Sequence, residues 1–419
     1  MKNQIVLASM LICLGGRLAV AQSPDQPANP RPIPPTSPGN ANELTTDLST
    51  PFFASPPQVA VEEPSPSTYR LWAKVDYLMW WLKPVCLKPP TLTMGSPDDA
   101  VPGALGPLHT ELVMGEHKFE FGGAPGIRPS VGIWLTDDQF LSWETDGFLL
   151  EQDAASQSFQ SHNGSPAAYI PFQDSANVNQ ALPFTIPGVV DGHSIAVGRS
   201  RLWGVESDLA AHFCTTRSGY LLSAALVGGF RYLNLEDQVT ATNEQNLVSN
   251  PSVFAIGSDH FETRNQFYGA QLGSTLGLSR DKWSLEMDTK LALGDTHQVS
   301  EVSGQPLSAG APVLPQLLPG PVLVLPSNTG KQSADRLTLV PEMAFTLHYA
   351  LTQKVGLSLG YSCLYWNKVL CPGDQMDNHL NVTQLPLHGP LVGPGLPAPL
   401  FVHTDAFAQG LNVGLEVRY

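Results

Sequence analysis

The sequence predicts an all-β fold, namely a transmembrane antiparallel up-and-down β-barrel of about ten strands, with twelve strands as the alternative. Three observations lead to it. The last segment of the chain alternates apolar and polar residues, an export signal is followed by no apolar membrane helix, and long and short gaps alternate between strand-like segments. Because only helices and closed barrels satisfy their backbone hydrogen bonds in lipid, membrane residence here requires strands.

The chain divides into three regions. Residues 1–21 have the features of a secretory signal peptide, with Lys2 as the positive end, an apolar core at 5–14 and small residues at 19–21. Residues 22–68 are rich in Pro, Ser, Thr and Asn and predict a disordered tether; a cell-wall-binding or partner-binding arm is the alternative. Residues 69–419 form the predicted barrel domain, in which no stretch reaches the roughly 18 apolar residues of a membrane helix.

Composition and charge narrow the possible partners. Hydrophobic residues make up 42% of the chain and charged residues 14%, and the net charge is −15. Nucleic acid is excluded as a partner because phosphate binding needs a basic patch. Cys13 leaves with the signal peptide. Cys86, Cys214, Cys363 and Cys371 remain in a compartment that permits disulfides, and all three possible pairings stay open.

Period-two segments separated by Pro- and Gly-rich stretches run from Tyr69 to the end of the chain. In the clearest one, Trp283 and Leu285 begin an apolar face, and Glu286 and Asp288 lie on the other. A soluble sandwich turns such an apolar face inward and a barrel in lipid turns it outward, so alternation alone does not separate them. The predicted strands are 70–82, 127–136, 142–153, 200–213, 219–236, 262–279, 281–294, 336–350, 354–368 and 405–419.

The gaps between these segments alternate in length. Counting back from the C-terminus, the long gaps are 371–404, 295–335, 237–261 and 154–199, and the short ones are 351–353, 279–282, 214–219 and 137–141. Outer-membrane barrels have long external loops and short periplasmic turns, so the long gaps are predicted to be external. The strand-like pattern at 117–121 is placed inside the first external loop. A hairpin hidden in that loop would give twelve strands.

Aromatic residues favour a barrel over a soluble sheet. They include Trp72, Tyr77, Trp80, Trp81, Trp134, Trp143, Trp203, Tyr220, Trp283, Tyr349, Tyr361, Tyr365, Trp366 and Tyr419, mostly near segment ends. This placement is typical of the interfacial girdles of membrane barrels.

The final strand carries a pattern typical of an assembly signal. Asn412, Gly414, Val417 and the terminal Tyr419 give a polar residue, a glycine, an apolar residue and an aromatic end, as in bacterial outer-membrane barrels. An ordinary last strand is the alternative. The signal predicts the barrel-assembly machinery as a partner and outer-membrane lipid as the environment.

Several short strings give the chain a family resemblance. They are Trp80 with Trp81, 102–106 (PGALG), 229–236 (GFRYLNLE), 265–273 (NQFYGAQLG), 290–294 (KLALG), 340–342, 360–361, 364–366, 372–375, 409–412 and 414–416. In this order they resemble the family catalogued as beta-barrel porin family seven, over roughly residues 69–419. The resemblance implies an outer-membrane β-barrel with a porin role. It supplies no catalytic or ligand-binding residues.

Charged residues gather on the polar faces of the predicted strands. Nine are acidic and five basic, and the candidates for the lumen are Asp76, Glu206, Asp208, Arg231, Glu286, Asp288, Lys290 and Glu342. They form either a self-paired charge ladder that fills a narrow lumen or a constriction that prefers cations, since carboxylate rings select by sign. Barrel diameter grows with strand number, so ten strands enclose a narrow interior.

We therefore expect an outer-membrane barrel that passes small solutes or ions. The alternative is a structural or adhesive surface protein anchored by a closed barrel, and a third class is a secreted sandwich that binds glycans. No enzyme is expected, because no nucleophile-elbow motif surrounds Ser165. No cofactor or metal is expected either, because the spacing of His379 and His388 with Asp374 and Asp377 is loose.

Overall fold

The computed structural model describes residues 70–309, 322–385 and 390–419. The predicted signal peptide and tether lie outside the described residues. Within the described part of the chain, no helix is long and apolar enough to cross a membrane.

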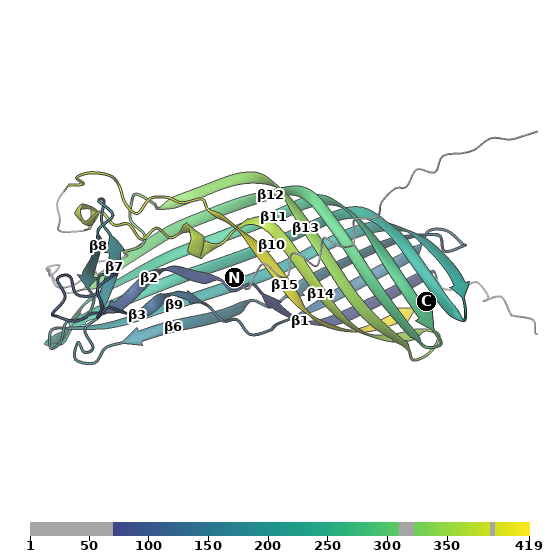
Figure 1. Ribbon diagram of the computed structural model, residues 1–419, viewed down its shortest axis with the longest axis horizontal. Helices are drawn as coiled ribbons and strands as arrows, with labels where there is room; N and C mark the ends of the chain where they lie inside the picture. The colour runs from purple at the N-terminus through teal and green to yellow at the C-terminus, as the bar shows by residue number, and fades with distance from the viewer. Residues whose placement is uncertain (1–69, 310–321, 386–389) are drawn as a thin grey trace, which may run out of the picture. The chain divides into compact units, whose positions relative to one another are not determined.

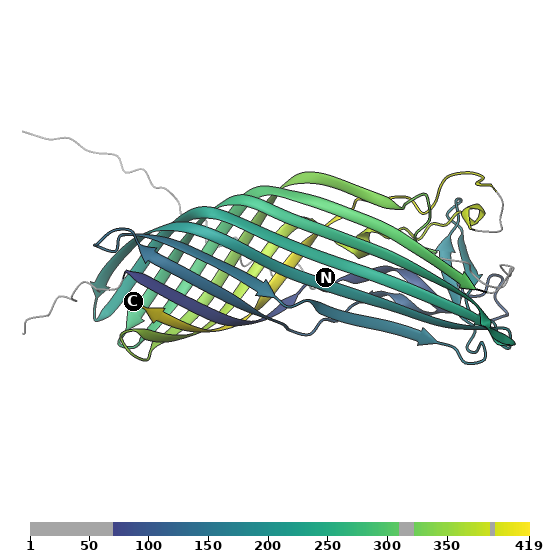
Figure 2. The ribbon, with the colours of Figure 1, turned by 180° about the vertical axis from the view of Figure 1, so that it is seen from behind.

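Ten antiparallel strands form the wall of a closed barrel (Figures 1 and 2). Each pairs with the next around the ring, β15 pairs with β1, and the pairing of β9 with β10 closes the circle. The wall strands are β1 (Leu71–Leu82), β4 (Ala124–Trp134), β5 (Leu141–Leu150), β9 (Val190–Arg217), β10 (Tyr220–Leu247), β11 (Asn250–Arg280), β12 (Trp283–Ala309), β13 (Gly330–Ala350), β14 (Val355–Leu370) and β15 (His403–Arg418).

The strand count confirms the prediction of ten and makes the alternative of twelve wrong. The lengths differ from the prediction, because β9, β10, β11 and β12 have 28, 28, 31 and 27 residues. Much of three long gaps predicted to be loops is therefore strand. A membrane-crossing strand needs about 9–11 residues. The half of each of these strands that lies away from the short turns, called here its far half, therefore extends well beyond a bilayer. There β6 (Asp153–Gln160) pairs with the far half of β9.

A second sheet lies at the far end of the barrel, on the same side as the long connections (Figure 1). It contains β2 (Cys86–Met94), β3 (Glu111–Lys118), β7 (Tyr169–Gln173) and β8 (Asn179–Pro183). The pattern predicted at 117–121 overlaps β3 and lies outside the wall, as expected. Two short 3-10 helices, η2 (Pro372–Gln375) and η3 (Val382–Gln384), follow β14.

The outer face of the wall carries an apolar band at the end with the short turns. Large apolar side chains point away from the barrel there, among them Val75 (55% exposed), Leu226 (62%) and Leu272 (74%). On the far side of the band the outer face becomes charged, with an Arg264–Glu236 ion pair of 3.2 Å across β11 and β10. An exposed apolar surface ending at a charged edge is typical of a wall that faces lipid.

The aromatic prediction is wrong at four positions. Trp80 and Trp366 are fully buried inside the barrel, not in an interfacial girdle. Trp72 and Trp134 also line the interior of the barrel. The even-numbered residues of β1 face inward, and Trp80 is one of them. Its neighbour Trp81 is 41% exposed on the outer face. Trp283 and Tyr349 do stack beside a short turn, with ring centroids 4.7 Å apart.

Asp259 holds the loop that contains Val322 and Val324 against the far half of the barrel. It lies fully buried on β11, and its carboxylate accepts the backbone N–H groups of Val324 at 2.7 Å and Val322 at 3.5 Å. Burial raises the pKa of Asp259 to about 7, while these backbone hydrogen bonds act in the opposite direction.

We expect the attachment of this loop to weaken as pH rises. The folded-state pKa of Asp259 is raised, so its contribution to stability is full below the unfolded pKa and is lost as pH rises through about 7. Amide hydrogen exchange at Val322 and Val324, relative to Asp259→Asn at the same pH, should accelerate about tenfold or more between about pH 5 and about pH 8. If the ratio of wild-type to Asp259→Asn exchange rates stays constant across that pH range, the raised pKa of Asp259 is contradicted.

Candidate functional site

Successive side chains of a strand point to opposite faces of the wall, and this places the charged residues in the interior of the barrel. In β9, Val205 and Leu209 face outward, so Glu206 and Asp208 between them face inward. The same alternation places Arg231 on the inner face of β10 and Lys290 on the inner face of β12.

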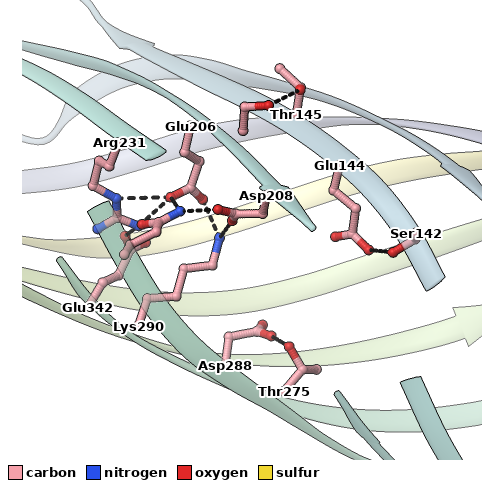
Figure 3. Close-up of polar contacts among 12 residues, drawn as sticks. Ser142, Glu144, Thr145, Glu206, Asp208, Arg231, Thr275, Asp288, Lys290 and Glu342 are labelled. Carbon is pink, nitrogen blue, oxygen red and sulfur yellow. Dashed lines mark hydrogen bonds and ion pairs between the residues drawn. The ribbon is translucent and has the colours of Figure 1, made fainter. Parts of the chain in front are cut away.

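Glu206 is the centre of an ion-pair cluster that crosses the lumen (Figure 3). Arg231 donates to its Oε2 through Nε at 2.9 Å and Nη2 at 2.5 Å, and Lys290 Nζ donates to its Oε1 at 2.5 Å. Lys290 also reaches Asp208 Oδ2 at 2.9 Å, and Gln271 bridges Glu206 and Asp208 at 2.9 and 2.6 Å. Since β9 and β12 are not neighbours in the wall, the Lys290 contacts span the interior.

The cluster continues to the opposite side of the barrel through Glu342. Arg231 Nη2 lies 2.6 Å from Glu342 Oε2, and Arg128 Nη2 lies 3.7 Å from Glu342 Oε1. Arg128 also stacks on the rings of Trp80 and Phe148, at 5.1 and 5.5 Å. These contacts join side chains from β4, β9, β10, β12 and β13, so opposite charges pair across the lumen.

The other predicted lumen residues lie closer to the short turns and are less densely paired. Asp76 is 3.1 Å from Lys74, and Asp288 accepts a 2.6 Å hydrogen bond from Thr275. Glu286 has His348 as its nearest ion-pair partner, at 3.9 Å. A cavity of about 440 Å³ lies among Asp76, Glu286 and Asp288 and has Arg128, Glu206, Lys290 and Glu342 on its inner wall.

An apolar layer fills the interior beyond the ion-pair cluster. It consists of inward-facing side chains from nearly every wall strand, including Leu78, Trp80, Phe148, Leu233, Phe267, Val340, Leu364 and Trp366. A further apolar core lies beyond it, between the far halves of the strands and the second sheet.

All eight predicted lumen residues therefore lie on the inner face, and five of them meet in the cluster: Glu206, Asp208, Arg231, Lys290 and Glu342. Arg128 and Gln271 also belong to the cluster, and the sequence did not predict them. Arg128 lies in a Pro- and Gly-rich strand with weak alternation, and an uncharged Gln gives no signal in a search for charges. The apolar layer was also missed, because Leu78 and Trp80 occupy the face predicted to be polar.

The proposed assembly-signal residues occupy structural positions in β15. Asn412 is buried, accepts from Trp80 Nε1 at 2.8 Å and donates to Ser362 at 2.7 Å. A Cβ on Gly414 would lie 2.0 Å from Asp76 Oδ1, so any other residue there would have to displace the Asp76 side chain. Val417 pairs with Ala73 and Val355, and Tyr419 is 64% exposed. Recognition of these residues during assembly stays a prediction.

The loop residues considered for metal binding are held by hydrogen bonds. Asp377 Oδ1 lies 2.6 Å from His379 Nδ1, and Asp377 Oδ2 accepts from the Ala398 backbone at 2.7 Å. Asp374 pairs with Lys88. His388 lies outside the described residues, among which no His, Cys, Asp and Glu side chains gather as a metal site.

Family comparison supplies the deciding observation. Residues 72–419 match the family described as "Putative beta barrel porin-7". The chain belongs to this family. It is an outer-membrane β-barrel protein, in agreement with the apolar band around its wall. No curated protein matches the chain.

Solved structures of outer-membrane barrels give weaker similarities. The outer membrane protease OmpT from Escherichia coli is 8% identical with a TM-score of 0.42, over 85% of this chain and 99% of that one. The Pseudomonas putida toluene transporter TodX is 9% identical with a TM-score of 0.20, over 84% and 90%. A Pseudomonas aeruginosa FadL homologue is 6% identical with a TM-score of 0.18, over 84% and 90%. TM-scores this low support no inference about substrate or mechanism.

Proposed function

We propose that this porin-family member serves chiefly as an outer-membrane anchor, with a closed lumen and a large folded structure carried at the cell surface. The ion-pair cluster is the observation that carries the proposal. Lys290 on β12 reaches Glu206 and Asp208 on β9, so charged side chains bridge the lumen at the level of the apolar band. Outer-membrane lipid and the barrel-assembly machinery are the partners that this role requires.

The layers beyond the cluster support the same role. Trp80, Phe267 and Trp366 are fully buried in the apolar layer, which leaves little room for a hydrated solute. The far halves of β9 to β12 and the second sheet then form a surface structure much larger than a channel needs. At about 3.3 Å per residue, the 31 residues of β11 span roughly 100 Å, against a hydrocarbon core of about 30 Å.

A cation-preferring channel is the second candidate, favoured by the cavity of about 440 Å³ among Asp76, Glu286 and Asp288. Carboxylates around a water-filled space attract cations and exclude anions. In this role the small solutes or cations would pass only when the cluster of Glu206, Arg231 and Lys290 rearranges. Neither role assigns catalysis to the chain.

Conductance in planar lipid bilayers distinguishes the two roles. We expect the purified wild-type protein, with its folded state checked by heat-modifiable gel mobility, to give no steady conductance steps. Steady, cation-selective steps would reject the closed anchor and favour the channel. In that case Glu286→Gln with Asp288→Asn should weaken the cation preference, most strongly at low salt, where charges are least screened. Anion preference would reject both proposals.

A further inference from the structure

A second cavity, of about 250 Å³, lies beyond the ion-pair cluster where β1 ends. Its walls come from the end of β1 and the residues after it, and from β9, β10, β14 and β15. Leu202, Leu235, Leu364, Trp366 and Val369 line it, and all five are buried. A cavity of about 150 Å³ with such a lining is known to hold a benzene ring, so this one has room for a small apolar molecule.

Two buried carboxyl groups, those of Asp237 and Asp374, line this apolar space. Asp237, on the inner side of β10, is 6% exposed and lines the cavity. The side chain of Ser200 hydrogen-bonds the carboxyl group, but no described residue donates to Oδ1. Burial raises the pKa of Asp237 to about 7. A buried acceptor without a donor is destabilising, so a ligand that supplied the donor would gain free energy on binding.

The other polar groups around the cavity are already engaged. Lys83 Nζ donates to Thr404 Oγ1 at 3.0 Å and to the Asp405 carbonyl at 2.6 Å, and Lys88 pairs with Asp374. Burial raises the pKa of the Cys371 thiol to about 12, which keeps it neutral. Of the two buried carboxyl groups in the described lining, Asp374 therefore has Lys88 as its ion-pair partner, whereas no cation lies within ion-pair distance of Asp237.

The cavity is reached from the barrel surface. Lys83 and Asp405 line it and are exposed, so they mark its mouth between the end of β1 and β15. The backbone of Lys83 also donates to the Phe407 carbonyl at 2.8 Å, which fixes this edge of the mouth. A small molecule therefore meets charged groups at the entrance and an apolar space inside.

We propose that this cavity binds a small apolar amine, with its ammonium group donating to Asp237 Oδ1 and its apolar body packed against Leu235 and Trp366. A charged donor forms a stronger hydrogen bond to a carboxylate than a neutral donor does. An organic anion is disfavoured, because Asp237 and Asp374 both lie in the lining. The proposal is independent of whether the lumen conducts.

The test uses ¹⁹F NMR with the full chain in lipid nanodiscs and 4-fluorobenzylamine as the probe. We expect saturable binding that Asp237→Asn weakens about tenfold or more, while 4-fluorobenzyl alcohol, which is neutral, changes by less than about threefold. Binding of the amine should strengthen as the pH rises through about 7, because Asp237 ionises there. The other titratable groups facing the cavity are Lys83, Lys88, Cys86, Cys371, Asp374 and Asp405.

Two controls keep the test decisive. Asp405→Asn removes a carboxylate at the mouth and should leave amine binding unchanged, whereas Leu235→Trp should fill the cavity and abolish binding of both probes. Heat-modifiable mobility confirms that each variant is folded. The proposal is overturned if the wild type does not bind the amine, or if Asp237→Asn binds it as tightly and with the same pH dependence.

Discussion

Replacing Arg231 with methionine is expected to destabilise the barrel by about 3–5 kcal/mol, because removing one partner of a buried ion pair leaves uncompensated charge. Arg231 is 2% exposed and joins Glu206 at 2.5 Å to Glu342 at 2.6 Å. Methionine keeps much of the length of the side chain without its charge. The midpoint of urea unfolding, followed by tryptophan fluorescence in detergent micelles, measures the loss.

A matched double variant separates charge from packing. Arg231→Met with Glu342→Gln removes one positive and one negative charge, so it should recover part of the stability lost in Arg231→Met. Arg280→Met, at an exposed arginine beside the short turn, should change stability by less than about 0.5 kcal/mol. If Arg231→Met unfolds at the wild-type midpoint, the cluster does not hold the interior together.

Leu272→Arg is expected to impair membrane assembly strongly. Leu272 is 74% exposed in the middle of the apolar band, where arginine costs roughly 2–4 kcal/mol on the lipid face. Leu285→Arg should be milder, because Leu285 lies beside the short turn, where the cost falls to about 0–1 kcal/mol. The fraction of chain with heat-modifiable mobility in the outer-membrane fraction reports assembly.

Glu286→Gln is the matched substitution on the inner face of the same strand as Leu285. It should leave assembly nearly intact, since the one ion-pair partner of Glu286 among the described residues is His348, at 3.9 Å. Equal assembly of Leu272→Arg, Leu285→Arg and Glu286→Gln would mean that the outer face does not contact lipid.

The membrane part of the fold was predictable because lipid imposes a strong pattern. A wall strand in the band must alternate an apolar outer residue with an inner one, as Trp283 to Lys290 do in β12. Beyond the band both faces can be polar, so the far halves of β9 to β13 carry no such pattern and the sequence predicts loops there. The second sheet was missed for a related reason, since its strands are short and interrupted by Pro and Gly.

The site was predictable to the extent that register determines it. Arg231 and Glu206 lie equally far from the turn at Ser218 and Gly219, and they pair directly across β9 and β10. Lys290 lies opposite Glu342 by register, yet it bonds to Glu206 and Asp208 across the lumen. Contacts across a lumen depend on how the barrel closes and on its diameter. The register between two neighbouring strands determines neither. The burial of Trp80 and Trp366 was unpredictable for the same reason.

The surface accessibility of two epitope tags tests whether the barrel anchors a large structure outside the cell. One epitope tag is inserted at residues 248–249, at the tip of the β10–β11 hairpin, and a second, in a separate variant, at residues 281–282 in the β11–β12 turn. On intact cells, antibody should label the tag at 248–249 and not the tag at 281–282. After the outer membrane is permeabilised, both tags should be labelled. If intact cells instead label the tag at 281–282 and protect the tag at 248–249, the long strands do not extend outside the cell.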